Sequence, residues 1–217
     1  MSLKPIVMDL EMSGLNVREN GIWQIGAIDL NTMEEFLEEG RLDDEDTVDQ
    51  GALKVIGKTE EELRDSNKMS QKELLEKFFK WVGEKPVKIF LCQNPQFDIS
   101  FLEMRRAKYD LDKVYNHRAF DLHTIGQMVH LKTDKAFLIQ NRGSKMSLTK
   151  ILEFCGLKDE RIQMKNNEVQ SEGTPHNALE DCKLTAECFS RLVYGKNLFE
   201  IFAKFEVPEY LKQEEEK

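Results

Sequence analysis

The stretch that decides the fold is Ile6-Val7-Met8-Asp9-Leu10-Glu11-Met12-Ser13-Gly14-Leu15, an apolar run that ends in two carboxylates. On a β-strand, residues two apart point to the same face and lie roughly 6–7 Å from each other. Asp9 and Glu11 would therefore aim two negative charges at one place, which raises a pKa or requires a cation between them. A solvated strand end is the ordinary explanation of an isolated Asp-X-Glu. Here the pair closes a buried strand and runs into a glycine turn, where open α/β sheets bind their ligands.

Length and composition indicate a globular α/β protein. A chain of 217 residues, 33% charged and 40% hydrophobic, can bury a sizeable core. We expect one domain over residues 1–212 and a charged tail over residues 213–217. No apolar run reaches the roughly 20 residues that cross a bilayer, and no N-terminal segment indicates export. The four cysteines form no CxxC pair, which is typical of reduced intracellular thiols. We therefore expect a cytoplasmic protein without a membrane partner, and the oligomeric state is left open.

Charge is unevenly distributed along the chain. The net charge of −9 argues against an extended nucleic-acid track, because non-specific binding depends on cations that face phosphates. Residues 104–150 nevertheless carry ten Lys and Arg against four Asp, a local charge of +6, which leaves −15 on the rest. Such a stretch is ordinarily a solvated face, but it could also hold a short polyanion. Charge alone leaves the two readings open.

Apolar and alternating segments predict three consecutive strands over residues 4–10, 22–30 and 33–42. Ser70-Gln71-Lys72-Glu73 is a capping-box sequence that opens an amphipathic helix extending to Val82. Further segments are expected as helices at 50–56, 96–109, from Asp121, at 147–155, from Pro175 or Asn177 to about Tyr194 and near the C-terminus, as strands at 87–92 and 114–120, as a basic loop at 133–146 and as irregular chain at 157–174.

Two further polar motifs stand at predicted element ends. Gln93-Asn94-Pro95-Gln96-Phe97-Asp98 follows the apolar strand at 87–92, and His176-Asn177-Ala178-Leu179-Glu180-Asp181 opens the long helix. Each has an ordinary explanation by itself. Asp98 would complement a helix dipole, His176 would be a polar helix-start residue, and Asp181 would be a solvated charge.

Together these motifs resemble a known family. Asp9-X-Glu11, then Asp98, then His176 with Asp181 five residues later are similar to the three ordered motifs of the DEDDh family of 3′–5′ exonucleases. The resemblance covers roughly residues 6–191. It implies an α/β, ribonuclease H-like fold, with a mixed five-stranded sheet that has antiparallel edge strands and a parallel centre and is flanked by helices.

The resemblance also implies a catalytic site with two divalent metal ions, Mg²⁺ or Mn²⁺, roughly 3.5–4 Å apart. Asp9 would bridge both metals, Glu11 and Asp181 would hold the metal that carries the attacking water, and Asp98 would support the second metal. His176 would act as general base, since its reference pKa near 6.5 suits proton abstraction at neutral pH. The implied reaction releases 5′-mononucleotides from the 3′ end of single-stranded or short nucleic acid.

In the family, the residues after the first carboxylate pair contact the 3′-terminal nucleotide, and Met12, Ser13 and Leu15 occupy those places here. Packing of Met12 and Leu15 under the neighbouring helix is an equally weighted alternative. The other histidines, His117, His123 and His130, have no ligand-like spacing and are expected to be structural.

Subfamily features disagree with one another. The first motif is closer to the Asp-Leu-Glu-Met-Thr-Gly-Leu of oligoribonucleases, whereas Asn94–Asp98 is closer to proofreading and RNA-trimming members, so DNA or RNA preference is open. One alternative function is a non-catalytic nucleic-acid-binding domain, against which all five filled motif positions argue. Another is a proofreading subunit within a polymerase complex. The stretch after Tyr210 has no apolar stripe for such a partner.

Overall fold

The structure is a computed structural model that describes residues 3–165, 168–171 and 173–213. It divides into two compact units, residues 1–120 with 160–182 and residues 121–159 with 183–217. The expected single domain over residues 1–212 stays a prediction. The expected tail lies outside the described residues apart from Gln213.

The first unit holds most of the strands. Its elements are β1 (Ile6–Met12), β2 (Ile22–Asp29), β3 (Glu34–Arg41), α1 (Gln50–Ile56), α2 (Glu60–Leu63), β4 (Met69–Ser70), α3 (Gln71–Gly83), β5 (Phe90–Cys92), α4 (Pro95–Lys108), β9 (Gln163–Lys165) and β10 (Glu168–Ser171). Two elements run from this unit into the second, β6 (Ala119–Asp121) and α7 (Ala178–Tyr194). The second unit adds α5 (Leu122–Asp134), β7 (Ile139–Gln140), β8 (Gly143–Ser144), α6 (Leu148–Phe154) and the 3-10 turns η1 (Glu200–Phe202) and η2 (Glu209–Leu211).

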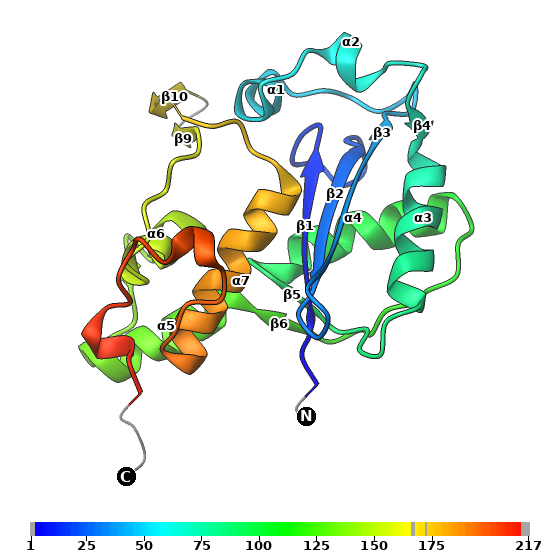
Figure 1. Ribbon diagram of the computed structural model, residues 1–217. Helices are drawn as coiled ribbons and strands as arrows, with labels where there is room; N and C mark the ends of the chain where they lie inside the picture. Colours follow the sequence, from blue (N-terminus) through cyan, green and yellow to red (C-terminus); the bar gives the residue numbers. More distant parts are fainter. Residues whose placement is uncertain (1–2, 166–167, 172, 214–217) are drawn as a thin grey trace. The chain divides into compact units, whose positions relative to one another are not determined.

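The sheet has the strand order β4-β3-β2-β1-β5-β6. β1, β2 and β3 pair antiparallel in sequence, as they lie side by side in Figure 1, and β5 pairs parallel with β1 on its other side. This confirms the predicted mixed sheet of a ribonuclease H-like fold. The structure adds a two-residue strand, β4, which pairs parallel with the end of β3.

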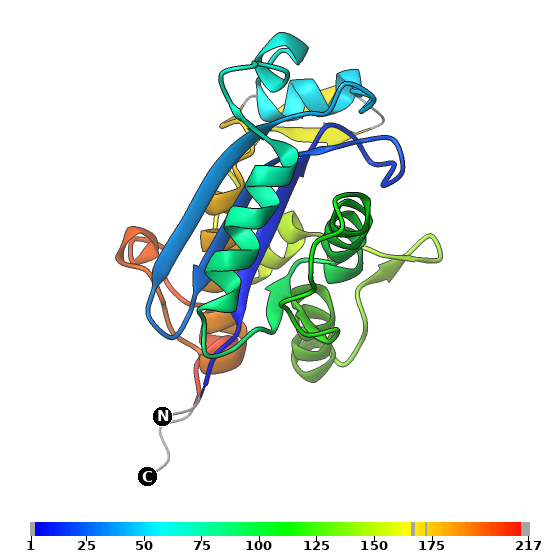
Figure 2. The same ribbon diagram turned by 90° about the vertical axis from the view of Figure 1, so that its right-hand side faces the viewer.

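Alternation along β1 separates the core from the polar face. Ile6, Met8 and Leu10 point into the main hydrophobic cluster, which they share with Leu74 and Phe78 of α3. Figure 2 shows α3 lying along the strands on that side. Asp9 and Glu11 therefore point to the opposite face of the sheet. The alternation of side chains along β1 is therefore enough to place both carboxylates on the face away from α3.

Helix boundaries follow the predicted caps. Gly57 ends α1 with a φ of 65°, a left-handed conformation that glycine adopts without strain. Ser70 and Glu73 form the predicted capping box at the start of α3. Asp121 caps α5 by accepting hydrogen bonds from the backbone N–H groups of His123 and Thr124.

Some expectations were wrong. β9 and β10 in the segment expected to be irregular pair antiparallel, and the basic segment at 133–146 contains the β7–β8 hairpin. The expected C-terminal helix is replaced by η1 and η2, because Pro208 has no backbone N–H to continue a helix. The central strand is shorter than predicted and begins at Phe90.

A buried ion pair anchors the second unit. Arg191 and Glu187 are fully buried on α7, with 2.8 Å between Nε and Oε1. The Arg191 guanidinium also donates to the carbonyls of Cys155 and Phe205. All four cysteines are free thiols and are buried. None of the helices in the described part of the chain combines the length and apolar composition that crossing a bilayer requires.

Candidate active site

The first unit brings acidic side chains from three distant segments to one face of the sheet. Glu11 at the end of β1, Asp98 in the first turn of α4 and Asp181 in the first turn of α7 are all buried, at 8%, 5% and 4% exposed. Asp9, two residues before Glu11, is half-buried and lies within electrostatic reach of Asp98 and Asp181. Each of the other three predicted carboxylates therefore lies within electrostatic reach of Asp9.

Gly26 lets the start of α7 approach the sheet. It lies opposite Asp9 in the register of β1 and β2, so both face the same side. A Cβ at Gly26 would stand 2.3 Å from the carbonyl carbon of Ala178 and 2.4 Å from the backbone nitrogen of Leu179. The Cys182 thiol donates to the Gly26 carbonyl at 3.2 Å. The missing side chain is what allows the helix to place its acidic residue over the strand.

Gln24, opposite Glu11 in the same register, joins the sheet to the first turn of α7. Its Oε1 accepts a hydrogen bond of 2.8 Å from the backbone N–H of Ala178, and its Nε2 donates to Glu39. Asn177 Oδ1 accepts from the N–H groups of Leu179 and Glu180, as a helix cap does. The helix start is thus held by side chains that satisfy its otherwise unpaired donors.

The second motif places Asp98 by its backbone. Asn94 has a φ of 63°, and Pro95 occupies the first turn of α4, where a missing N–H costs nothing. Hydrogen bonds from the backbone of Asp98 itself and of Leu10 reach the Asp98 carboxylate. This ties the first turn of α4 to β1, close to Asp9. Phe97 packs against the hydrophobic core, with its ring 5.3 Å from that of Phe101.

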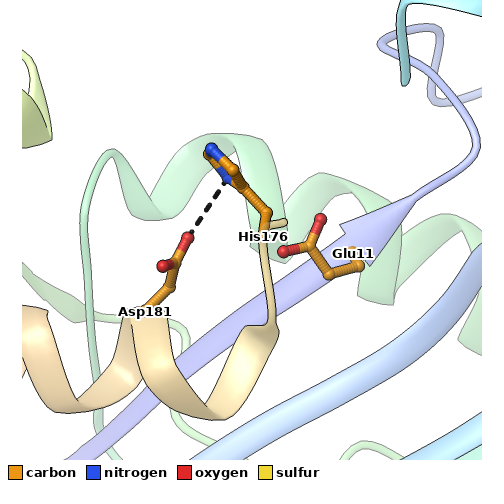
Figure 3. A group of neighbouring side chains, drawn as sticks. All are labelled: Glu11, His176 and Asp181. Atoms are coloured by element: carbon orange, nitrogen blue, oxygen red, sulfur yellow. Dashed lines mark ion pairs between the residues drawn. The ribbon is translucent and has the colours of Figure 1, made fainter. Parts of the chain in front are cut away.

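His176 lies just before α7 and joins the acidic group. One ligand atom each of Glu11, His176 and Asp181 lies within 4.8 Å of the other two (Figure 3). The ring Nδ1 is 3.4 Å from Oδ2 of Asp181, and Nε2 is 2.9 Å from the carbonyl oxygen of Ile162. The backbone N–H of His176 donates to the Val55 carbonyl at 3.1 Å.

Burial and neighbouring negative charge raise the pKa values of the carboxyls. Burial raises the pKa of Glu11 to about 8, and the charge of Asp181 adds to this effect. Burial, followed by Asp181, Asp98 and Glu11, raises the pKa of Asp9 well above its ordinary value. Burial raises the pKa of Asp98 to about 7 against its backbone hydrogen bonds. Burial is thus the largest cause at all three carboxyls, and neighbouring negative charges add to it at Asp9 and Glu11.

The oxygen atoms of the cluster are suited to a divalent cation. Oε1 of Glu11 and Oδ1 of Asp181 are buried and have no hydrogen-bond partner among the described residues. Buried polar atoms in native proteins are nearly always paired, so an orphaned pair beside further carboxylates indicates a missing ligand. Hard oxygen donors of this kind are what Mg²⁺ and Mn²⁺ prefer.

The histidine is shifted toward its charged form. Burial disfavours the imidazolium, but the hydrogen bond to Asp181 and the charge of that residue outweigh burial and raise the pKa of His176 above its ordinary value. A carbonyl oxygen can only accept, so the ring nitrogen that faces Ile162 carries a proton. Both nitrogens of His176 are therefore engaged within the protein.

Arg161 is a site residue that the sequence did not reveal. Its Nη1 is 2.9 Å from Oδ2 of Asp181, and its side chain is 11% exposed. It stands in the segment with no clear periodicity, twenty residues before its partner, and it forms no part of a motif. Only the folding of the segment before β9 against the chain that leads to His176 brings it into the site.

The predicted substrate residues occupy different environments. Leu15 is 77% exposed, whereas Met12 is half-buried and packs against the core. The Ser13 hydroxyl is fully buried; it donates to the Thr47 carbonyl and accepts from the backbone N–H of Gly21. Both hydrogen bonds of the hydroxyl thus stabilise the turn after β1.

Acidic partners neutralise part of the basic stretch at 104–150. Arg105 forms a buried ion pair with Asp46 at 2.8 Å. Arg106 and Lys113 both bind Glu103, and Lys108 binds acidic residues of the 43–45 segment. In the first unit, therefore, these cations form ion pairs within the protein.

Comparisons with known proteins agree with this geometry. A family model described as an exonuclease, RNase_T, matches residues 6–189. No curated protein matches the chain significantly in sequence.

Solved structures share the fold. A structure of exonuclease I matches with a TM-score of 0.66 and 16% identity over 88% of this chain and 41% of that chain. A zinc-bound complex of E. coli exonuclease I with single-stranded DNA matches with a TM-score of 0.64 and 16% identity, over 89% of this chain and 40% of that chain. The nuclease domain of 3′hExo, a DEDDh family member bound to rAMP, matches with a TM-score of 0.59 and 16% identity, over 94% of this chain and 95% of that chain. The present chain thus spans about 40% of the length of exonuclease I.

Proposed function

Because the chain belongs to the exonuclease family RNase_T, we propose that it removes nucleotides from the 3′ end of single-stranded or short nucleic acid, DNA or RNA, and releases 5′-mononucleotides. One observation carries the proposal: ligand atoms of Glu11, His176 and Asp181 lie within 4.8 Å of one another, and Asp9 is within electrostatic reach of Glu11, Asp98 and Asp181. The single-stranded DNA bound by exonuclease I and the rAMP bound by 3′hExo support nucleic acid as the substrate class.

The same four carboxylates are the proposed metal ligands. The raised pKa values of Asp9 and Glu11 reflect burial and the charges of neighbouring carboxylates, which a dication would relieve, and one oxygen each of Glu11 and Asp181 is unpaired among the described residues. Bound Mg²⁺ or Mn²⁺ would supply an activated water and neutralise charge on the phosphate oxygens. We assign Asp9, Glu11 and Asp181 to direct coordination and Asp98, which is held by the backbone, to support of a second ion.

His176 is the proposed general base. To accept a proton from water, one ring nitrogen must be unprotonated and face the substrate, whereas here both nitrogens face protein oxygens. The ring must therefore leave either Ile162 or Asp181 before it acts. Its position before the first turn of α7, outside the helix ladder, allows this rotation without unwinding the helix.

The turn after β1 is the proposed reader of the 3′ end. Leu15 offers an exposed apolar side chain that can pack on a terminal base, and Met12 offers the exposed part of its side chain nearer the carboxylates. Ser13 would contribute through the turn that its hydroxyl holds, between Thr47 and Gly21.

A 3′-end degradation assay tests this function. Matched single-stranded DNA and RNA, labelled at the 5′ end, are incubated with Mg²⁺, Mn²⁺ or chelator, and products are resolved on gels and by chromatography. We expect a ladder that shortens from the 3′ end and 5′-mononucleotides, only with metal. Asp181→Asn is the matched inactive control.

The outcome also separates the alternatives. Binding of nucleic acid without hydrolysis of either substrate in the presence of metal would favour a non-catalytic binding domain. Hydrolysis that needs an added polymerase complex would favour a proofreading subunit.

A further inference from the structure

Arg161 forms an ion pair with a carboxylate of the acidic cluster. Its guanidinium bonds to Oδ2 of Asp181 at 2.9 Å, and Nδ1 of His176 approaches the same oxygen at 3.4 Å. The positive charge of Arg161 also opposes the rise in the pKa values of Asp9 and Glu11, which burial and neighbouring carboxylates cause. One guanidinium thus partly offsets the negative charge of Asp9, Glu11 and Asp181.

The backbone around Arg161 is fixed against the chain that leads to the histidine. The N–H of Ile162 donates to the Thr174 carbonyl at 2.9 Å, and the N–H of Thr174 donates to Glu160 at 2.8 Å. A Cβ at Gly173 would stand 2.6 Å from the carbonyl carbon of Arg161, so the two segments touch closely. The segment that carries the guanidinium is therefore a fixed part of the site.

The same segment also holds His176. The carbonyl of Ile162, the residue after Arg161, receives the proton of the His176 Nε2 at 2.9 Å. Residues 161 and 162 consequently engage the two groups on which the proposed reaction depends, the Asp181 carboxylate and the imidazole. Separation of this segment from the site would free both of them together.

We propose that Arg161 is a built-in counter-ion that competes with the metal ion for Asp181. The guanidinium already neutralises Asp181 through Oδ2, while Oδ1 of the same carboxylate has no partner among the described residues. A divalent cation that binds at Oδ1 therefore meets the positive charge of Arg161 a few ångströms away. The inference rests on the proposed function, since it assumes that Asp181 is a metal ligand. In this scheme Arg161 sets the affinity for metal through its charge.

A titration with Mn²⁺ in the absence of nucleic acid tests the proposal. Arg161→Gln removes the charge and keeps a polar side chain, and calorimetry measures its affinity for Mn²⁺ against the wild type. We expect about tenfold tighter binding, the effect of removing one unit charge a few ångströms from the ion at high effective dielectric. Arg118→Gln, an exposed site in the same unit, is the control for the change in net charge and should leave the affinity unchanged.

Arg161→Lys keeps the test valid if the glutamine variant fails to fold. A lysine cannot form the planar fork of a guanidinium, so its hold on Asp181 is weaker and Mn²⁺ should bind at least twofold more tightly than to the wild type. Folding of Arg161→Gln with Mn²⁺ but not with chelator would also support the proposal, because the ion then replaces the guanidinium.

Two results separate the inference from the function on which it rests. Wild-type affinity, or weaker binding, in both Arg161 variants would overturn the competition while leaving the metal site intact. A wild-type protein that binds no Mn²⁺ at millimolar concentration would instead overturn the proposed metal site itself.

Discussion

A Cβ on Gly26 would stand 2.3 Å from the carbonyl carbon of Ala178, closer than any real side chain approaches a backbone. This contact joins β2, beside Asp9, to the first turn of α7, which carries Asp181. The geometry of the acidic cluster therefore depends on a residue with no chemistry of its own.

Gly26→Ala should push α7 away from the sheet. Overpacking of this kind costs roughly 1–3 kcal/mol of the free energy of unfolding, which urea denaturation measures. Gly83→Ala is the matched control, since a Cβ there meets no described atom within 4 Å and alanine favours the end of α3. Equal stability of the two variants would contradict the close approach.

His176→Ala should lose roughly 10²–10⁴-fold in turnover, the usual contribution of a general base, while metal binding persists. Steady-state rates on a labelled oligonucleotide measure the first effect, and Mn²⁺ titration measures the second. His117→Ala, at an exposed position away from any motif, should keep wild-type turnover. Turnover near wild type in His176→Ala would remove the imidazole from the mechanism.

Asp9→Asn should abolish metal binding and yet stabilise the ion-free fold. The charged Asp9 carboxylate is disfavoured by burial and by Asp181, Asp98 and Glu11, and an amide of the same shape escapes these costs. We therefore expect a higher free energy of unfolding than the wild type in chelator. Denaturation with chelator and with Mg²⁺ measures it. A less stable variant in chelator would show that the carboxylate is favourably placed without metal.

The ion-free protein should lose stability as the pH rises from about 5 to 8. In the folded state the pKa of Glu11 is about 8 and that of Asp98 about 7, whereas unfolded carboxyls titrate near 4. The folded state thus binds more protons in this window, and its advantage disappears as the pH rises through the folded values. The raised pKa of His176 acts in the same direction.

Thermal unfolding in chelator across this pH range measures the slope. Saturating Mg²⁺ should reduce it, because the ions take the place of the protons. A melting temperature that stays flat, or rises, between pH 5 and 8 in chelator would contradict the crowding of charge.

Leu15→Ala should weaken binding of the 3′ end without affecting stability, because the side chain is 77% exposed. We expect a several-fold rise in KM on short oligonucleotides, since stacking contacts with a base contribute about 1–3 kcal/mol. Unchanged KM and turnover would assign the reading of the end to other residues.

Some side chains of the candidate site could be identified from the sequence, whereas the residues that support them could not. Asp9 and Glu11 were readable from strand alternation, and Asp98 and Asp181 from their places at helix starts. The resemblance to DEDDh exonucleases is confirmed at the level of the exonuclease family and its fold. The roles of the five motif residues stay predictions.

Residues that act through tertiary contacts could not be predicted. Gln24 looks like an ordinary strand residue until the N–H of Ala178 meets its side chain. Arg161 lies in a segment without period, and its partner is twenty residues away. The antiparallel pairing of β9 with β10 was missed for a similar reason: the two strands are short and mostly polar, so their pairing and not a hydrophobic pattern defines them.

The most direct measurement of the central claim is an anomalous difference map from a crystal of the protein soaked in Mn²⁺. We predict a peak within bonding distance of carboxylate oxygens from Asp9, Glu11 and Asp181. A map without a peak among these residues at saturating Mn²⁺, or with the ion bound elsewhere, would contradict it.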